Sequence, residues 1–173
     1  MNKEELLPGI TAYYDINIDF DQLSEYYSNT EWQEAKVYAG AETDRKLRDA
    51  STKMFNDLSP AIRAEIYKYV DEYATRNGLE DLDLVDAFSL VKYNVGQFFV
   101  NHSDGGPGMP RRLSMVVYLN DDYEGGEISF TKFGIAFKMP KNTMILFPST
   151  EEYSHAAEAV TDGTKHVLIG FWR

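Results

Sequence analysis

The chain has 173 residues, of which 43% are hydrophobic and 14% aromatic, and it contains no cysteine. This length and apolar content predict one folded domain over residues 1–173 rather than a disordered chain. The missing cysteines exclude disulfides, thiolate metal sites and thiol catalysis. The formal net charge is −11, and no Lys/Arg cluster is larger than Arg111-Arg112. Because DNA- and RNA-binding proteins present a basic face, we expect no nucleic-acid partner, and a cationic or neutral polypeptide fits better.

The first residues, Met1 to Glu5, are polar and acidic and lack the apolar stretch of a signal peptide. No apolar run approaches the roughly 18–20 residues that a membrane-spanning helix needs. We therefore expect a cytoplasmic protein with no membrane partner.

The first half of the chain carries the pattern of helices. A short helix is predicted over residues 19–27. A second follows the cap Ser59-Pro60, repeats apolar residues at helical spacing, and ends at Asn77-Gly78. The polar residues 38–57 between the two are expected to form a loop or a short hairpin.

From Phe88 onward the pattern changes to short apolar segments separated by Gly, Pro, Asn and Asp turns. Such a series is typical of a jelly-roll sandwich or barrel. The predicted strands cover residues 88–93, 97–102, 113–119, 127–130, 134–137, 143–147 and 166–172.

The most informative motif is His102-Ser103-Asp104, followed later by His155, in a chain with only three histidines. Two histidines and one carboxylate form the facial triad that binds non-haem Fe(II) and leaves positions open for substrate and dioxygen. In a strand, residues i and i+2 point to the same side, so His102 and Asp104 can bind one metal while His155 arrives from another strand. A His-x-Asp triplet alone is weak evidence, since short motifs also occur by accident.

Lys165 begins the last predicted strand, ten residues after His155, and shares one face with Val167, Ile169 and Phe171. A lysine on an apolar face is costly to bury without a partner, and a bound carboxylate could provide one. The alternative is a lysine that lies in solvent at the start of the strand.

Four blocks in order resemble the prolyl 4-hydroxylase-like 2-oxoglutarate/Fe(II) dioxygenases. The resemblance covers roughly residues 88–173. The blocks are Tyr93 to Asp104, Arg111 to Asn120, Tyr123 to Glu127, and the C-terminal segment with Phe147-Pro148-Ser149, His155, Val160 and Gly163-Thr164-Lys165.

The resemblance implies an α+β protein with a double-stranded β-helix (a jelly roll, cupin-like) as its core. Residues 88–173 would form this core, and residues 1–87 a mainly helical support region whose helices pack on it. The implied cofactors are Fe(II), 2-oxoglutarate as co-substrate and O2, with ascorbate as an optional reductant.

The same resemblance assigns His102, Asp104 and His155 to iron, and Lys165 and Tyr93 to 2-oxoglutarate. Tyr118 and Ser114 fall on the pocket side of their strand by alternation and are further 2-oxoglutarate contacts, with ordinary strand packing as the alternative. Arg111 matches a position that contacts the peptide substrate in some members, with a solvated arginine as the alternative. His166 points to the opposite face from Lys165 and is not counted as a ligand.

Two departures from the family concern the substrate. The family usually carries a tryptophan six residues after the basic residue, whereas this chain has Phe171 there and Trp172 one position later, on the other face. The segment between Asp104 and His155 is also short for the family.

The sequence thus predicts a dioxygenase that hydroxylates a peptidyl proline and produces succinate and CO2. The same chemistry on another residue or on a small molecule is a second hypothesis, because function depends on the loops around the site. A non-catalytic β-helix binding module is a third, but such a module has no need of the iron ligands and Lys165 together.

Overall fold

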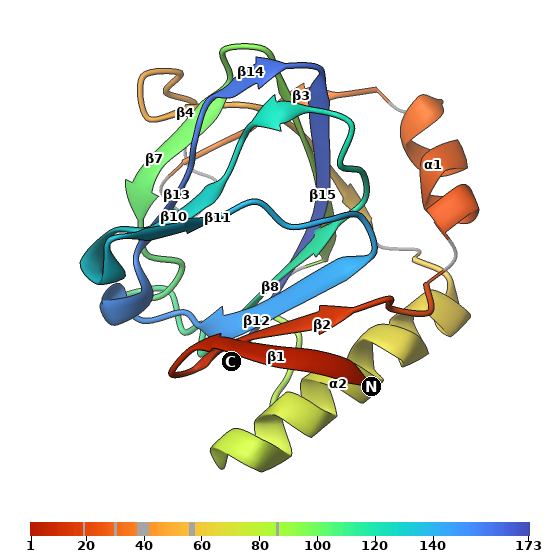
Figure 1. Ribbon diagram of the computed structural model, residues 1–173, viewed down its shortest axis with the longest axis vertical. Coiled ribbons are helices and arrows are strands. Elements are labelled where there is room, and N and C mark those ends of the chain that lie inside the picture. The colour runs from red at the N-terminus through yellow and green to blue at the C-terminus, as the bar shows by residue number, and fades with distance from the viewer. Residues whose placement is uncertain (19, 30, 38–41, 56–57, 86) are drawn as a thin grey trace.

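The computed structural model describes residues 1–18, 20–29, 31–37, 42–55, 58–85 and 87–173, and its core is two antiparallel sheets that face each other (Figure 1). The larger sheet has the order β1 (Asn2–Leu7), β2 (Ile10–Tyr14), β12 (Thr143–Pro148), β8 (Leu113–Tyr118), β15 (Thr164–Trp172), β6 (Phe88–Asn94), β5 (Ser51–Phe55) and β3 (Gln33–Glu34). The smaller sheet has the order β11 (Ile135–Phe137), β10 (Ile128–Phe130), β13 (His155–Ala157), β7 (Phe98–His102) and β4 (Arg48–Asp49). A separate pair joins β14 (Val160–Asp162) to β9 (Glu124–Gly125).

The two faces of the larger sheet have different partners. One face shares a core with the long helix α2 (Pro60–Asn77), which runs along the outside of the sheet in Figure 1. The other face packs against the smaller sheet. Residues alternate between the two cores along β8, where Val117 belongs to the helix side and Tyr118 to the inner side, as strand geometry requires.

Helix α2 follows its sequence pattern closely. It begins at Pro60, whose missing N–H costs nothing in the first turn, and it ends where Gly78 adopts a left-handed φ of 65° and donates its N–H to the carbonyl of Ala74. Ser59 occupies the cap position without making a side-chain hydrogen bond to the helix. The buried stripe of α2 comprises Ile62, Ile66, Tyr69, Val70, Tyr73 and Ala74.

The prediction of a mainly helical region over residues 1–87 is wrong. This part holds α1 (Phe20–Ser28) and α2 but also β1 to β5, and these strands extend both sheets. The strands escaped prediction for a physical reason. Strand β2 is buried on both faces, which removes the alternation of polar and apolar residues, and the edge strand β1 is mostly exposed and charged.

Within residues 38–57, residues 42–55 form two short strands rather than a loop, and residues 38–41 and 56–57 lie outside the described residues. Strand β4 pairs with β7 and strand β5 with β6, so the connection at the buried residue Ala50 crosses from the smaller sheet to the larger one. No helix among the described residues is long and apolar enough to cross a membrane.

Candidate active site

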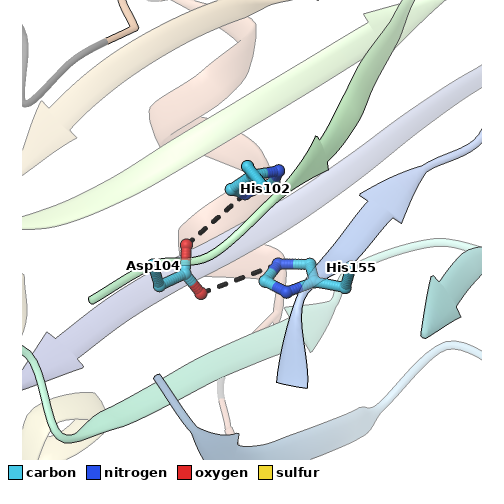
Figure 2. A group of neighbouring side chains, drawn as sticks. All are labelled: His102, Asp104 and His155. Atoms are coloured by element: carbon cyan, nitrogen blue, oxygen red, sulfur yellow. Dashed lines mark ion pairs between the residues drawn. The ribbon is translucent and has the colours of Figure 1, made fainter. Parts of the chain in front are cut away.

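A cavity of about 1110 Å³ lies between the two sheets, and the three predicted metal ligands lie in its wall. His102 ends β7, and His155 begins β13 directly opposite His102 in the register of the two strands. Asp104 lies two residues beyond the end of β7, in a bend rather than in the strand as predicted. Figure 2 shows both imidazoles directed at its carboxylate. His102 Nε2 lies 3.5 Å from Oδ1, and His155 Nε2 lies 3.6 Å from Oδ2.

Each imidazole is held by a backbone carbonyl. His102 Nδ1 lies 2.9 Å from the carbonyl oxygen of Val100, and His155 Nδ1 lies 3.1 Å from that of Tyr153. Because a carbonyl only accepts, Nδ1 carries the proton in both rings and Nε2 keeps its lone pair for a ligand. Burial lowers the pKa of His155 to about 4, so this ring is neutral at pH 7.

A serine hydroxyl orients the carboxylate of Asp104. The hydroxyl of Ser114 donates to Oδ2 at 2.7 Å and lies 2.8 Å from the hydroxyl of Ser149. Burial opposes ionisation of Asp104, but the adjacent imidazoles and the Ser114 hydroxyl outweigh it and hold the pKa of the carboxyl well below its ordinary value. Ser114 was predicted to contact 2-oxoglutarate, which stays a prediction, and in the structure its hydroxyl contacts the predicted metal ligand Asp104.

The donor set fits Fe(II). One carboxylate oxygen and two imidazole nitrogens lie within 4.8 Å of one another, and all three residues lie close to the same cavity. Two neutral imidazoles and one ionised carboxylate are the ligands of the non-haem iron triad. The backbone packs tightly at the turn after Asp104, so that only glycine fits at position 105. A Cβ on Gly105 would lie 2.5 Å from the carbonyl oxygen of Arg111.

Lys165 lies in the wall of the same cavity, buried to 3% exposure, and pairs with Tyr93 across β15 and β6. Its ammonium donates to the carbonyl of Gly126 at 2.6 Å and forms no ion pair with a carboxylate of the described residues. Burial lowers the pKa of Lys165 to about 8. The hydroxyl of Tyr118, whose ring centroid lies 5.3 Å from the ammonium, is buried and has no hydrogen-bond partner in the described part of the chain.

These groups fit an incoming carboxylate. A buried cation without an acid and a buried hydroxyl without a partner both carry an energetic cost, and an anionic oxygen between them would remove both costs. The 2-oxoglutarate contacts predicted at Lys165 and Tyr118 thus lie close to each other and line the same cavity as the metal triad.

Phe171 and Trp172 occupy opposite faces of β15, and Arg111 lies on the side of Phe171. The guanidinium carbon of Arg111 lies 3.8 Å from the ring centroid of Phe171, and its NH1 donates to the backbone carbonyl of Asp104 at 3.3 Å. Both Arg111 and Phe171 line the cavity. Trp172 is fully buried on the helix side, in edge contact with the ring of Tyr67. The predicted change of face is therefore correct.

Sequence reasoning missed two residues of the site. Ser149 belongs to one of the four blocks that resemble the family, but no role at the site was predicted for it. Arg48 lies in the polar segment that was expected to be a loop or hairpin, yet it lines the cavity from β4. A single basic residue in a charged segment carries no sequence signal, because only the pairing of β4 with β7 brings it to the site.

Comparison with known proteins identifies the family. A model of the 2OG-Fe(II) oxygenase superfamily matches residues 88–173, which contain the triad and Lys165. The chain belongs to the 2OG-Fe(II) oxygenase superfamily. Human (Homo sapiens) prolyl 3-hydroxylase 2 is 37% identical over 67 residues, which cover 36% of this chain and 9% of that protein. The oxygenase chain therefore spans less than a tenth of the length of this curated relative.

Solved structures show the same fold. A prolyl hydroxylase from Trichoplax adhaerens, in complex with a peptide fragment of hypoxia inducible factor, has a TM-score of 0.76 at 12% identity, covering 95% of this chain and 83% of its own. A Pseudomonas putida prolyl-4-hydroxylase has a TM-score of 0.72 at 18% identity, covering 95% and 92%. A viral collagen prolyl hydroxylase from Paramecium Bursaria Chlorella virus-1, in complex with 2OG, has a TM-score of 0.64 at 23% identity, covering 73% and 80%.

These findings confirm the predicted family and its cofactors Fe(II), 2-oxoglutarate and O2. They also confirm the prediction of a prolyl hydroxylase-like dioxygenase and the jelly-roll-like part of the predicted fold, which is mostly antiparallel sheet with few helices. The use of ascorbate stays a prediction.

Proposed function

We propose that this oxygenase hydroxylates a proline residue of a peptide or protein and converts 2-oxoglutarate to succinate and CO2. The observation that carries the proposal is the convergence of His102, Asp104 and His155 in a cavity that also contains the ammonium of Lys165. This ammonium is buried and has no carboxylate partner among the described residues. The similar solved structures from Trichoplax, Pseudomonas and the Chlorella virus are prolyl hydroxylases, and one of them contains a peptide, which favours a peptide substrate.

The residues of the chain would divide the work. The Nε2 atoms of His102 and His155 and the carboxylate of Asp104 would hold Fe(II), and Ser114 would keep that carboxylate ionised and oriented. Lys165 and Tyr118 would bind the distal carboxylate of 2-oxoglutarate. Bound together, Fe(II) and 2-oxoglutarate supply the activation of O2 that hydroxylation of an unactivated C–H bond requires.

The remaining space supports a peptide substrate. Pockets for single small ligands typically measure about 300–1000 Å³, whereas this cavity of about 1110 Å³ continues past the triad to Ile169, Phe171 and Met54. Met54 is 56% exposed and Ile169 is partly buried, so the outer part presents apolar surface toward solvent. Arg111, whose guanidinium carbon lies 3.8 Å from the ring centroid of Phe171, would contact the peptide backbone there.

The test is a peptide screen that follows two products. Wild-type enzyme with Fe(II), 2-oxoglutarate and proline-containing peptides should release succinate and add one oxygen atom to the proline, as mass spectrometry detects. Matched peptides with alanine in place of that proline should gain no oxygen, and Asp104→Ala should abolish both products. Succinate release coupled to oxidation of another residue would contradict the prolyl substrate while retaining the dioxygenase chemistry.

A further inference from the structure

Arg48 lies on β4 at the edge of the smaller sheet, and its side chain reaches the cavity wall. Its NH1 donates to the backbone carbonyl of Lys36 at 2.9 Å. Its Nε is buried without a hydrogen-bond partner in the described part of the chain. A buried donor without a partner lowers the stability of the fold, so the presence of Arg48 at this position suggests a role in function.

The first contact of Arg48 leads to the metal triad. Its guanidinium carbon lies 4.6 Å from the ring centroid of Phe99, its partner in the β4–β7 register. The same Phe99 ring is stacked on the imidazole of His102, with centroids 3.5 Å apart and planes inclined by 17°. Because His102 covers one face of the phenyl ring, the guanidinium takes the other. The imidazole is thus the last layer of a three-layer stack that restricts its rotation.

The second contact of Arg48 leads to the co-substrate pocket. Arg48 and Tyr93 both line the cavity, and the charge of Arg48 lies near enough to the Tyr93 hydroxyl to favour its ionisation, against the larger effect of burial. Because a guanidinium has donors only, the oxygen of Tyr93 can only accept from it, which leaves the O–H proton of Tyr93 free for another acceptor. Burial raises the pKa of Tyr93, so that proton stays in place at neutral pH. Tyr93 pairs with Lys165 across the strands, and both line the cavity.

We infer that Arg48 is a positioning residue for 2-oxoglutarate. It fixes the Tyr93 hydroxyl so that its proton is donated to an oxygen of the co-substrate, and it stabilises the ring stack behind His102. The inference rests on the proposed function and on the contact between Tyr93 and 2-oxoglutarate that the family resemblance implies.

A double-mutant cycle tests whether Arg48 acts through Tyr93. The measured quantity is the dissociation constant of 2-oxoglutarate for anaerobic Fe(II)-loaded protein, obtained by calorimetry, so that no turnover is needed. Arg48→Gln should weaken binding about tenfold in the wild-type background and less than twofold in the Tyr93→Phe background, as expected for one oriented hydrogen bond. The charge-transfer band of the bound chelate should also shift in Arg48→Gln, because the Phe99 ring that is stacked on the imidazole of His102 loses its guanidinium layer.

Arg45→Gln is the matched control, since Arg45 precedes the same strand, is exposed, pairs with Glu34 and does not itself line the cavity. It should leave the dissociation constant unchanged. Arg48→Lys serves as a second variant if Arg48→Gln lowers the thermal unfolding midpoint. Arg48→Lys keeps the positive charge, but a single ammonium cannot reach the carbonyl of Lys36 and the hydroxyl of Tyr93 together as the guanidinium would. It should therefore lose the energetic coupling to Tyr93 as Arg48→Gln does.

Equal losses from Arg48→Gln in both backgrounds would overturn the inference, because Arg48 would then act independently of Tyr93. An unchanged dissociation constant in Tyr93→Phe would also overturn it, while leaving the proposed function intact. A folded wild-type protein that binds no 2-oxoglutarate would instead refute the proposed function itself.

Discussion

Replacing Lys165 with methionine should stabilise the ligand-free protein and at the same time destroy the co-substrate site. In the folded chain the ammonium is 3% exposed and has one backbone acceptor and no acidic partner among the described residues. Burial lowers the pKa of Lys165 from 10.5 to about 8, so the folded state pays to keep this group charged at pH 7. Methionine fills a similar volume without that cost.

The size of the effect follows from the pKa difference. About 2.5 units at 1.36 kcal/mol per unit give an upper limit of about 3 kcal/mol for the charged lysine. Methionine also leaves the carbonyl of Gly126 without its donor, which costs about 1 kcal/mol. The net gain is therefore about 1–2 kcal/mol, or roughly 2–8 °C in unfolding midpoint for a domain of this length.

The pH dependence has a defined sign. Between the folded pKa of about 8 and the unfolded value of 10.5, the unfolded chain binds more protons than the folded chain. The stability of the wild-type protein relative to Lys165→Met should therefore rise from pH 8 to about pH 10.5. The advantage of the variant is largest below pH 8 and disappears near pH 10.5.

Urea unfolding of metal-free protein at pH 7, 8.5 and 10 measures the difference in free energy of unfolding between the wild type and Lys165→Met. The matched control is Lys46→Met, which removes an exposed lysine. Calorimetry with Fe(II) under anaerobic conditions should show 2-oxoglutarate binding weakened roughly 10- to 150-fold in Lys165→Met, the value of a charge-assisted hydrogen bond. A variant that is less stable than wild type at pH 7, or that binds 2-oxoglutarate normally, would refute the reasoning.

Three further substitutions separate the parts of the site. Ser114→Ala should weaken Fe(II) binding at least tenfold, because Asp104 loses its 2.7 Å hydrogen bond; competition with a chelator measures this, and an unchanged affinity would contradict the assigned contact. Gly126→Ala should destabilise the fold by about 1–3 kcal/mol in urea unfolding, since Gly126 has a φ of +67° and the added Cβ would lie 3.2 Å from Cδ of Lys165. Phe171→Ala should raise the KM for a peptide several-fold without changing the dissociation constant of 2-oxoglutarate, and equal losses of both would argue against a peptide role.

The chemistry of the site was largely predictable from local patterns and family blocks. The spacing of His102 and Asp104 indicated one metal, and the register of β7 and β13 brings His155 opposite His102. Lys165 was recognisable because a lysine that leads an apolar strand face needs a carboxylate partner. Ligand chemistry indicated the metal residues and strand alternation indicated Lys165, although Asp104 lies in a bend just beyond β7.

The missed features depend on contacts between distant segments. Ser114 alternates toward the pocket as predicted, but only the approach of β12 and the Asp104 bend decides that its hydroxyl contacts Asp104 and Ser149. The strands of the first half were missed because β2 is buried on both faces and β1 is an exposed edge. Arg48 was missed because its role arises from the pairing of β4 with β7.

The most direct test of the account is an anaerobic titration of the apoprotein with Fe(II) and 2-oxoglutarate, followed by the metal-to-ligand charge-transfer band of the chelate. We expect a saturable band for the wild-type protein, with His155→Ala and Lys165→Ala each weakening it. We also expect Lys46→Met to leave it unchanged. A folded wild-type protein without this band would mean that His102, Asp104 and His155 do not assemble an iron site, and would contradict the account.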